Sequence, residues 1–149
     1  MKLAIGNDHA GYEYKLVIKK MLEEQGHEVI DCGSHSADSC DFPVYAKKTA
    51  DCVASGEVER GVLVCGTGIG VSITANKVKG IRCALCNDIL SARLTKTHNN
   101  ANIIAFGARI IGIETAKAIV NEWMNAEFLG GKYQRRLDML TAIENGEDI

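Results

Sequence analysis

The sequence predicts a single α/β domain in which a parallel sheet is covered by helices on both faces. Three observations lead to it. The chain has 149 residues, the length of one ordinary domain. Five short apolar runs alternate with longer amphipathic stretches, the pattern of repeated β–α units. The apolar runs are unbroken, which indicates strands buried on both faces and hence a doubly wound parallel sheet. No repeat or composition shift divides residues 1–149 into two domains.

The elements follow in order from apolar periodicity and turn residues. Gly26 ends the first amphipathic helix, and Pro43 suits the first turn of the second. Asp88 is placed to cap a later helix, and Gly130 separates a long helix from a basic final one. The expected strands are 2–6, 27–32, 61–64, 81–86 and 102–106, and the expected helices are 12–25, 44–55, 71–77, 89–96, 113–128 and a last one from about 132, with a polar loop at 33–41.

Composition excludes several classes of protein. Hydrophobic residues make up 46% of the chain, and the formal net charge of −2 gives no field that favours nucleic acid or an anionic membrane. No window approaches the roughly 18 apolar residues of a membrane span, and the start turns polar at Asn7 without a signal-peptide core. We therefore expect a cytoplasmic protein with neither a nucleic-acid nor a membrane partner. The six cysteines are expected to be free thiols.

The sharpest local feature is Cys65 followed by three glycines in five residues, Gly66, Gly68 and Gly70. Ligands of doubly wound sheets bind beyond the carboxyl ends of the strands, and Cys65 ends the third one. Glycines let backbone N–H groups approach an anion at a helix amino end, whose dipole also favours a thiolate. The pattern predicts an anion site beside a reactive thiol. A tight turn of packing glycines after a buried cysteine is the alternative.

Further polar residues are expected at the same edge of the sheet. Asp8 and His9 follow the first strand, and Asp8 can orient the His9 ring. His98 and Asn99 end the fourth helix, and Arg109 follows the last strand. These positions predict one cluster around the glycine loop.

The final helix begins with cations that suit a phosphate. Lys132 and Arg136 are four residues apart and share one helix face, and with Arg109 they could hold a phosphate group. A solvated basic face is the alternative.

Several other readings of the motifs are weaker. The glycine spacing is G-x-G-x-G after the third strand, which is neither a dinucleotide fingerprint nor a Walker loop. Cys83 and Cys86 form a C-x-x-C within a predicted strand, where their side chains point to opposite faces and serve packing. A thiol-redox protein that uses this pair stays open as an alternative. So does a non-catalytic FMN-binding module, although Trp123 is expected in mid-helix, away from the site.

Several blocks of sequence stand in order along nearly the whole chain. They are residues 6–11 (GNDHAG), 41–43 (DFP), 64–70 (VCGTGIG), 75–77 (ANK), 98–102 (HNNAN), 106–109 (FGAR) and 130–132 (GGK). Together they resemble the ribose-5-phosphate isomerase B (LacA/LacB/RpiB) family. The resemblance implies a flavodoxin-like, Rossmann-type sheet of five parallel strands followed by a C-terminal helix. It also implies a homodimer or homotetramer whose active sites are shared between subunits, and neither metal nor cofactor.

The resemblance implies an aldose–ketose isomerase that interconverts ribose 5-phosphate and ribulose 5-phosphate through an enediolate. Carried over by position, Cys65 is the base, since no acid stands between it and Lys77. His98 is the acid that opens the furanose ring, with Thr67 beside it. The implied substrate contacts are Asp8, His9, Gly66, Thr67, Gly68, Ile69, Gly70, Asn99, Arg109, Lys132 and Arg136.

Two positions depart from the family pattern. Phe42 stands where the family commonly has tyrosine, which removes a hydroxyl near the sugar. Lys132 stands where arginine is common, so a point charge replaces a two-pronged fork. Isomerisation of a 6-phosphohexose, allose 6-phosphate or galactose 6-phosphate, therefore stays open.

Overall fold

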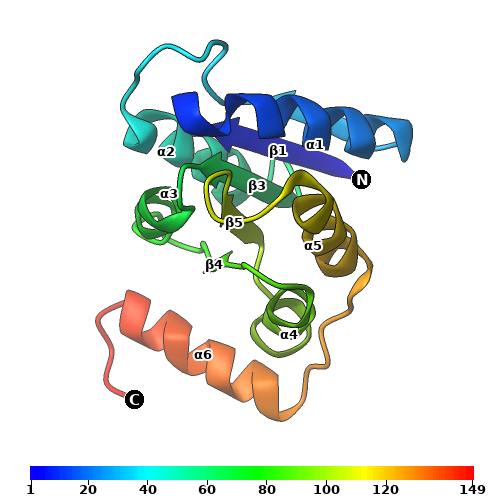
Figure 1. The fold of residues 1–149 in the computed structure, drawn as a ribbon. Coiled ribbons are helices and arrows are strands. Elements are labelled where there is room, and N and C mark those ends of the chain that lie inside the picture. Colours follow the sequence, from blue (N-terminus) through cyan, green and yellow to red (C-terminus); the bar gives the residue numbers. More distant parts are fainter.

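The computed structural model describes all 149 residues and shows five parallel strands between two layers of helices (Figure 1). The strand order is β2-β1-β3-β5-β4. This confirms the doubly wound α/β class. The order differs from the 2-1-3-4-5 order of flavodoxin only in that the last two strands exchange places, so that β5 lies between β3 and the edge strand β4. The strands are β1 (Lys2–Asn7), β2 (Glu28–Asp31), β3 (Arg60–Cys65), β4 (Cys83–Leu85) and β5 (Ile103–Gly107).

The helices divide between the two faces of the sheet. On one face α1, α4 and α5 enclose a cluster that includes Ile5, Val62 and Trp123, and on the other α2 and α3 enclose a second cluster around Leu63. Each fully buried aliphatic side chain adds about 2 kcal/mol of hydrophobic stabilisation. The helices are α1 (Tyr12–Glu24), α2 (Phe42–Ala54), α3 (Ile69–Ala75), α4 (Ile89–Asn99), α5 (Ile113–Asn125) and α6 (Lys132–Glu144), with a short 3-10 turn η1 (His9–Gly11) before α1.

Several predicted boundaries are confirmed by local geometry. Gly26 follows α1 with φ +88°, a conformation that glycine adopts without strain. Pro43 lies in the first turn of α2. The Asp88 carboxylate caps α4 by accepting the backbone N–H of Ser91 at 2.7 Å. Turn and cap residues in the sequence thus predicted correctly where α1 ends and where α2 and α4 begin.

Two elements differ most from the sequence prediction, each three residues shorter than expected, because tertiary contacts end them. The strand expected over 81–86 is reduced to β4, since the Asn102 side chain takes the N–H of Arg82 at 2.8 Å and binds the carbonyl of Gly80. The helix expected over 113–128 ends at Asn125, where the Arg60 guanidinium caps it by binding two of its last carbonyls at 3.1 Å. No helix has the length and apolar character needed to cross a membrane. The cytoplasmic location stays a prediction.

Candidate active site

The carboxyl ends of β1 and β3 meet where the strand order reverses, the position at which doubly wound sheets bind ligands. Asn7 pairs in register with Val64, and the Asp8 N–H donates to the Val64 carbonyl at 3.2 Å. The Asp8 carboxylate turns back along the chain, where Oδ1 accepts the N–H groups of Ala10 (2.9 Å) and Gly11 (3.1 Å). The Asp8 oxygen Oδ2 remains for a ligand.

The Asp8 carboxylate therefore caps η1. The prediction from the sequence that Asp8 orients the His9 ring is wrong. The His9 ring is held by the loop over residues 33–41, because Nδ1 accepts the N–H of Cys40 at 3.3 Å. The Cys40 sulfur lies 4.0 Å from the same nitrogen. In a neutral ring a nitrogen that accepts from an amide carries no proton, so Nε2 is the donor that His9 can offer.

The Cys65 sulfur lies at the last position of β3, under the glycine loop. Its Sγ accepts the backbone N–H of Gly68 at 3.0 Å, and the residue is 5% exposed. Gly68 has φ +78°, and a Cβ there would lie 2.6 Å from Leu85 and 2.7 Å from the backbone of Phe106. Only glycine allows the loop to fold back over the sulfur in this way.

The amino end of α3 presents unused backbone donors. The N–H groups of Gly66, Thr67 and Gly70 form no hydrogen bond within the chain, as is normal for the first turn of a helix. Thr67 and Ile69 are exposed, and the Thr67 hydroxyl accepts the Ile69 N–H at 3.2 Å. The loop can therefore offer several N–H groups to an anion beside Cys65.

Two side chains flank this loop. Arg109 follows β5 and donates its backbone N–H to the Gly66 carbonyl at 2.9 Å. Its guanidinium lies over Gly66, since a Cβ on that glycine would be 3.3 Å from Nη1. Phe42 places its ring against Gly70, where a Cβ would be 2.8 Å from Cζ. A cation and an aromatic ring thus lie on either side of the glycine loop.

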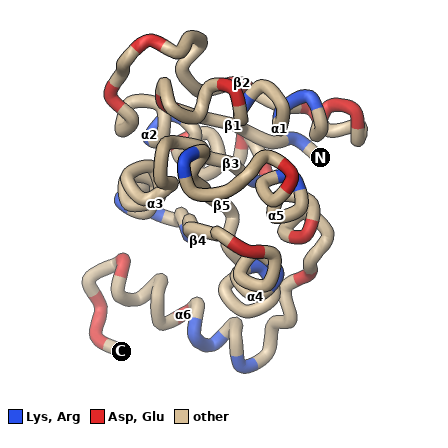
Figure 2. Tube along the Cα trace, viewed as in Figure 1, with Lys and Arg blue, Asp and Glu red and all other residues tan.

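His98, Asn99, Lys132 and Arg136 do not join this cluster within one chain, and the expectation of a single cluster is wrong. A helix that connects parallel strands runs back along the sheet, so the last turn of α4 lies at the amino edge. There the Asn99 carbonyl accepts from Arg82, the residue just before β4, at 3.1 Å. The edges are roughly 13 Å apart, because β5 spans four steps of about 3.3 Å. Figure 2 shows the basic start of α6 well away from the ends of β3 and β5.

At the amino edge the imidazole of His98 stacks on the ring of Tyr133, with centroids 4.4 Å apart and an interplanar angle of 7°. Lys132 and Arg136 lie over the same ring at 5.2 and 5.7 Å. Sequence reasoning missed Tyr133 and also Cys40. The only signal for Tyr133 was its position between two predicted phosphate ligands.

The structure disfavours both alternative classes of protein. Cys83 packs against the cluster on one face of the sheet and Cys86 belongs to the cluster on the other, as the alternation predicted. Burial raises the pKa of both thiols. Trp123 is fully buried and its indole N–H donates to the Ala101 carbonyl at 3.1 Å, so it cannot stack on a flavin.

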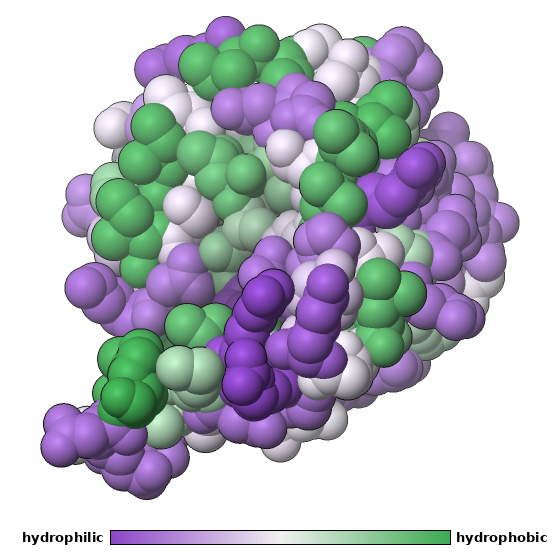
Figure 3. Space-filling model, turned by 90° about the horizontal axis from the view of Figure 1, so that it is seen from below, coloured by the Kyte–Doolittle hydropathy of each residue, from purple (hydrophilic) through white to green (hydrophobic).

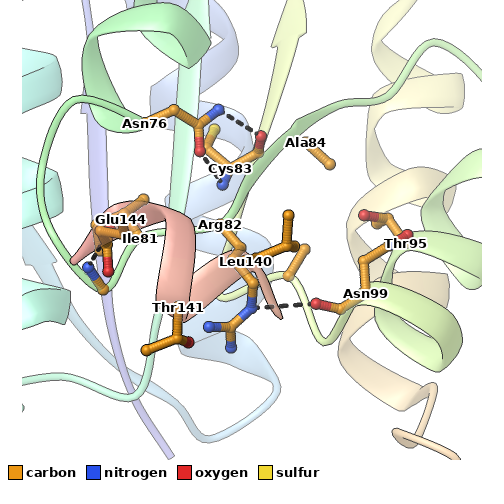
Figure 4. Close-up of a pocket in the computed structure, with 12 residues that line it drawn as sticks. Asn76, Ile81, Arg82, Cys83, Ala84, Thr95, Asn99, Leu140, Thr141 and Glu144 are labelled. Carbon is orange, nitrogen blue, oxygen red and sulfur yellow. Dashed lines mark hydrogen bonds between the residues drawn. The ribbon is translucent and has the colours of Figure 1, made fainter. Parts of the chain in front are cut away.

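A separate cavity of about 490 Å³ lies between α6 and the edge strand β4 (Figure 4). The Asn76 side chain bonds both the N–H and the carbonyl of Cys83 at 2.8 Å, which closes the open side of β4 at that residue. Leu140 and Thr141 of α6 face the strand across the cavity. The gap leaves α6 attached mainly through α4.

The two edges together carry a thiol that accepts a backbone N–H, free backbone donors beside it and a group of cations, an arrangement that suits the class of sugar-phosphate isomerases. A family model described as ribose/galactose isomerase matches residues 3–140. The chain belongs to this family and is an aldose–ketose isomerase.

Individual relatives agree with this assignment. The chain is 48% identical to ribose-5-phosphate isomerase B of Escherichia coli over 96% of each chain. It superposes on the Clostridium thermocellum ribose-5-phosphate isomerase B with a TM-score of 0.97 and 46% identity, covering 98% of this chain and 99% of that one. It also matches the Mycoplasma genitalium enzyme, solved with bound ribulose-5-phosphate, with a TM-score of 0.93 and 35% identity over 97% and 96%.

Proposed function

We propose that this chain interconverts ribose 5-phosphate and ribulose 5-phosphate, with Cys65 as the base that moves the proton between C2 and C1. The observation that carries the proposal is the N–H of Gly68, which points at the Cys65 sulfur at 3.0 Å. A backbone donor at the start of a helix favours a thiolate. The names of the relatives from Escherichia coli and Clostridium thermocellum support the pentose phosphate as substrate.

The proton transfers use groups that lie together at the carboxyl edge. The Cys65 thiolate takes the C2 proton of the open-chain aldose, and the electron pair of that bond moves to leave a negative charge on O1. The O2 hydroxyl proton moves to O1, which shifts the negative charge to O2. The same thiol then returns its proton to C1, and the O2 electron pair forms the C2 carbonyl of the ketose. The free N–H groups of Gly66, Thr67 and Gly70 are the donors for the enediolate, and one such donor contributes about 3 kcal/mol in other enzymes.

A complete site needs a second copy of the chain. His98, Asn99, Lys132 and Arg136 lie at the amino edge of the sheet, too far from Cys65 to touch the same sugar. In a twofold-symmetric homodimer the amino edge of each subunit can face the carboxyl edge of the other. Two identical sites then form, each with the thiol from one subunit and His98 from the other.

An exposed apolar surface supports this assembly. Ile69 and Ile73 of α3, Leu85 of β4 and Leu140 of α6 are between 38% and 56% exposed. Figure 3 shows hydrophobic patches on the left of the view, the side on which Figure 1 places α3 and the end of α6. A monomer rarely exposes so many large apolar groups together. The cavity beside β4 adjoins the same surface.

The remaining roles follow from charge and position. His98 of the second subunit donates the proton that opens the furanose ring, and Asn99 binds a sugar hydroxyl. Lys132 and Arg136 of that subunit, together with Arg109 of the first, bind the phosphate. Asp8 and His9 contact sugar hydroxyls through Oδ2 and Nε2. Phosphate binding far from C1 and C2 orients the chain of the sugar.

The test is turnover of ribose 5-phosphate by Cys65→Ala. We expect kcat to fall by at least about a thousandfold, within the range of a lost general base, while the dissociation constant of the sugar phosphate changes by less than about threefold. Cys52→Ala, which removes a thiol remote from the glycine loop, is the matched control and should keep full activity. Turnover near the wild-type rate by Cys65→Ala would refute the assignment.

The choice of sugar is tested separately with ribose 5-phosphate, allose 6-phosphate and galactose 6-phosphate. We expect the highest kcat/KM for the pentose. The contact of Phe42 with Gly70 narrows the space beside the loop, and Phe42 offers no hydroxyl to a longer sugar. A higher kcat/KM for either hexose phosphate would reassign the substrate and leave the role of Cys65 in place.

A further inference from the structure

The aromatic ring of Tyr133 is the common contact of three side chains that the proposed function uses. The His98 imidazole stacks on it at 4.4 Å and 7°, close to parallel. The Lys132 ammonium lies 5.2 Å and the Arg136 guanidinium 5.7 Å from its centroid. Tyr133 is partly buried between α4 and α6, whereas Lys132 and Arg136 are exposed. One ring therefore links the proposed ring-opening acid to the proposed phosphate ligands.

The backbone around Tyr133 brings the two helices together. The N–H of Leu129 donates to the Thr97 carbonyl in the last turn of α4 at 3.1 Å, which fixes the connection to α6 beside His98. Gly130 and Gly131 then adopt φ of +64° and +55° and reverse the chain into α6. Tyr133 follows in the first turn of that helix, directly opposite the end of α4.

The ring and not the hydroxyl makes these contacts. The Tyr133 side chain forms no hydrogen bond, whereas its π face meets an imidazole and two cations. Parallel stacking restricts rotation of the imidazole and leaves both of its nitrogens at the free edge of the stack. Cation–π contacts restrict the long side chains of Lys132 and Arg136 in the same way. Ordering these groups before the substrate arrives lowers the entropy lost on binding.

We propose that Tyr133 is a positioning residue, whose ring holds the His98 imidazole and the cations of Lys132 and Arg136 as one preorganised unit for the sugar phosphate. This inference rests on the proposed function for the identity of the ligand. Tyr133 itself touches neither the reacting carbons nor the transferred proton.

The experiment compares Tyr133→Leu, which removes the flat ring, with Tyr133→Phe, which keeps it. The first measurement is the dissociation constant of inorganic phosphate, which reports on the cations without requiring turnover. We expect Tyr133→Leu to weaken phosphate binding about tenfold and Tyr133→Phe to bind within about twofold of the wild type. If the leucine variant fails to fold, Tyr133→Met takes its place, since methionine keeps the bulk of the side chain without a ring. Equal affinity in all variants, or equal losses in Phe and Leu, would overturn the proposal.

The second measurement separates the effect on His98 from that on phosphate. Ribose 5-phosphate must be opened before it reacts, whereas an aldotetrose 4-phosphate cannot close a five-membered ring because its O4 carries the phosphate. We expect Tyr133→Leu to lower kcat about tenfold or more for the pentose and at most about threefold for the tetrose, with KM raised for both. Tyr133→Phe should restore kcat. Equal kcat losses on the two sugars would show a general structural effect and refute the link to His98.

The two measurements also separate this inference from the proposed function. A wild-type protein that binds phosphate but does not isomerise either sugar would refute the function. The phosphate affinities of the Leu and Phe variants would still decide whether Tyr133 organises the basic unit.

Discussion

Cys65 differs from the other cysteines in what surrounds its sulfur. All three of Cys65, Cys83 and Cys86 pack in or against the hydrophobic clusters, but only the Cys65 Sγ accepts a backbone N–H. Burial raises the pKa of Cys86 to about 12, and Asp88 adds to the effect. Burial also raises the pKa of Cys32 to about 12, with the neighbouring Cys52 thiol as a further cause. These buried thiols stay protonated at neutral pH, as inert packing groups do.

Thiol alkylation at pH 7.5 tests this difference. Because only the thiolate reacts, we expect Cys86 to be alkylated roughly a thousandfold more slowly than an ordinary exposed thiol. Cys83 should be equally slow, and the partly exposed Cys40 serves as the internal reference. Mass spectrometry of the alkylated peptides gives the rates. Fast labelling of Cys83 and Cys86, or a disulfide between them, would restore the thiol-redox alternative.

At the scale of single elements, the two ends of α4 are stabilised by different side chains at opposite edges of the sheet. Asp88 caps the amino end by a bond to Ser91, at the carboxyl edge of the sheet. At the other end Arg82 binds the carbonyls of Asn99 and Asn100, and Lys96 donates to the Asn100 side chain at 2.6 Å. These hydrogen bonds from Arg82 and Lys96 stabilise the end of the helix that carries His98. The same arrangement places Lys96, which is 9% exposed, near two positive charges.

The charge of Lys96 should therefore cost stability at neutral pH. Burial, followed by repulsion from Arg60 and Arg82, lowers its pKa from 10.5 to about 8. Between pH 8 and 10.5 the unfolded chain binds more protons at this site than the folded one, so this group makes stability rise with pH across that window. We expect Lys96→Met to raise the free energy of unfolding by about 1 to 2 kcal/mol at pH 7, after loss of the Asn100 bond.

Denaturant unfolding at several pH values gives the measurement. The advantage of Lys96→Met over the wild type should shrink from pH 8 upward, vanish at about pH 9 to 9.5, and become a deficit by about pH 10.5 because the Asn100 bond is lost. Lys47→Met, at an exposed position on α2, is the control and should show no such trend. A constant difference between Lys96→Met and the wild type at all pH values would contradict the assignment.

At the scale of the whole molecule, one chain carries the proposed site residues in two groups on opposite edges of its sheet. The carboxyl edge has the thiol and the glycine loop, and the amino edge has His98 and the basic start of α6. The separation follows from the β–α architecture itself, because strand ends and helix ends of parallel units lie on opposite sides. The proposed site is therefore complete only if two chains associate.

Complementation between inactive variants tests this arrangement. Cys65→Ala and His98→Asn should each be inactive or strongly impaired on ribose 5-phosphate. Random reassociation of equal amounts gives half heterodimers, each with one intact site, so about a quarter of wild-type activity should return. Mixing Cys65→Ala with Asp8→Asn, both at the carboxyl edge, is the matched control. No recovery in the first mixture, or equal recovery in both, would refute the shared site.

The sequence by itself determined the fold class, the order of the elements and the residues around Cys65. Continuous apolar strands, Gly26, Pro43 and Asp88 are local signals, and each acts within a few residues of its own position. The glycine loop was readable for the same reason, since Gly66, Gly68 and Gly70 directly follow Cys65 and the N–H of Gly68 binds its sulfur.

Only the tertiary structure decided where α5 and β4 stop, how His9 is held and which groups share an edge. Arg60 ends α5 from a distant strand, and Cys40 binds His9 across a loop. Tyr133 meets His98 because the chain reverses at Gly130 and Gly131. These contacts join residues far apart along the chain, and their partners are fixed by how helices pack and not by any local pattern. That is the physical reason why His98 was expected beside Cys65 but lies at the other edge.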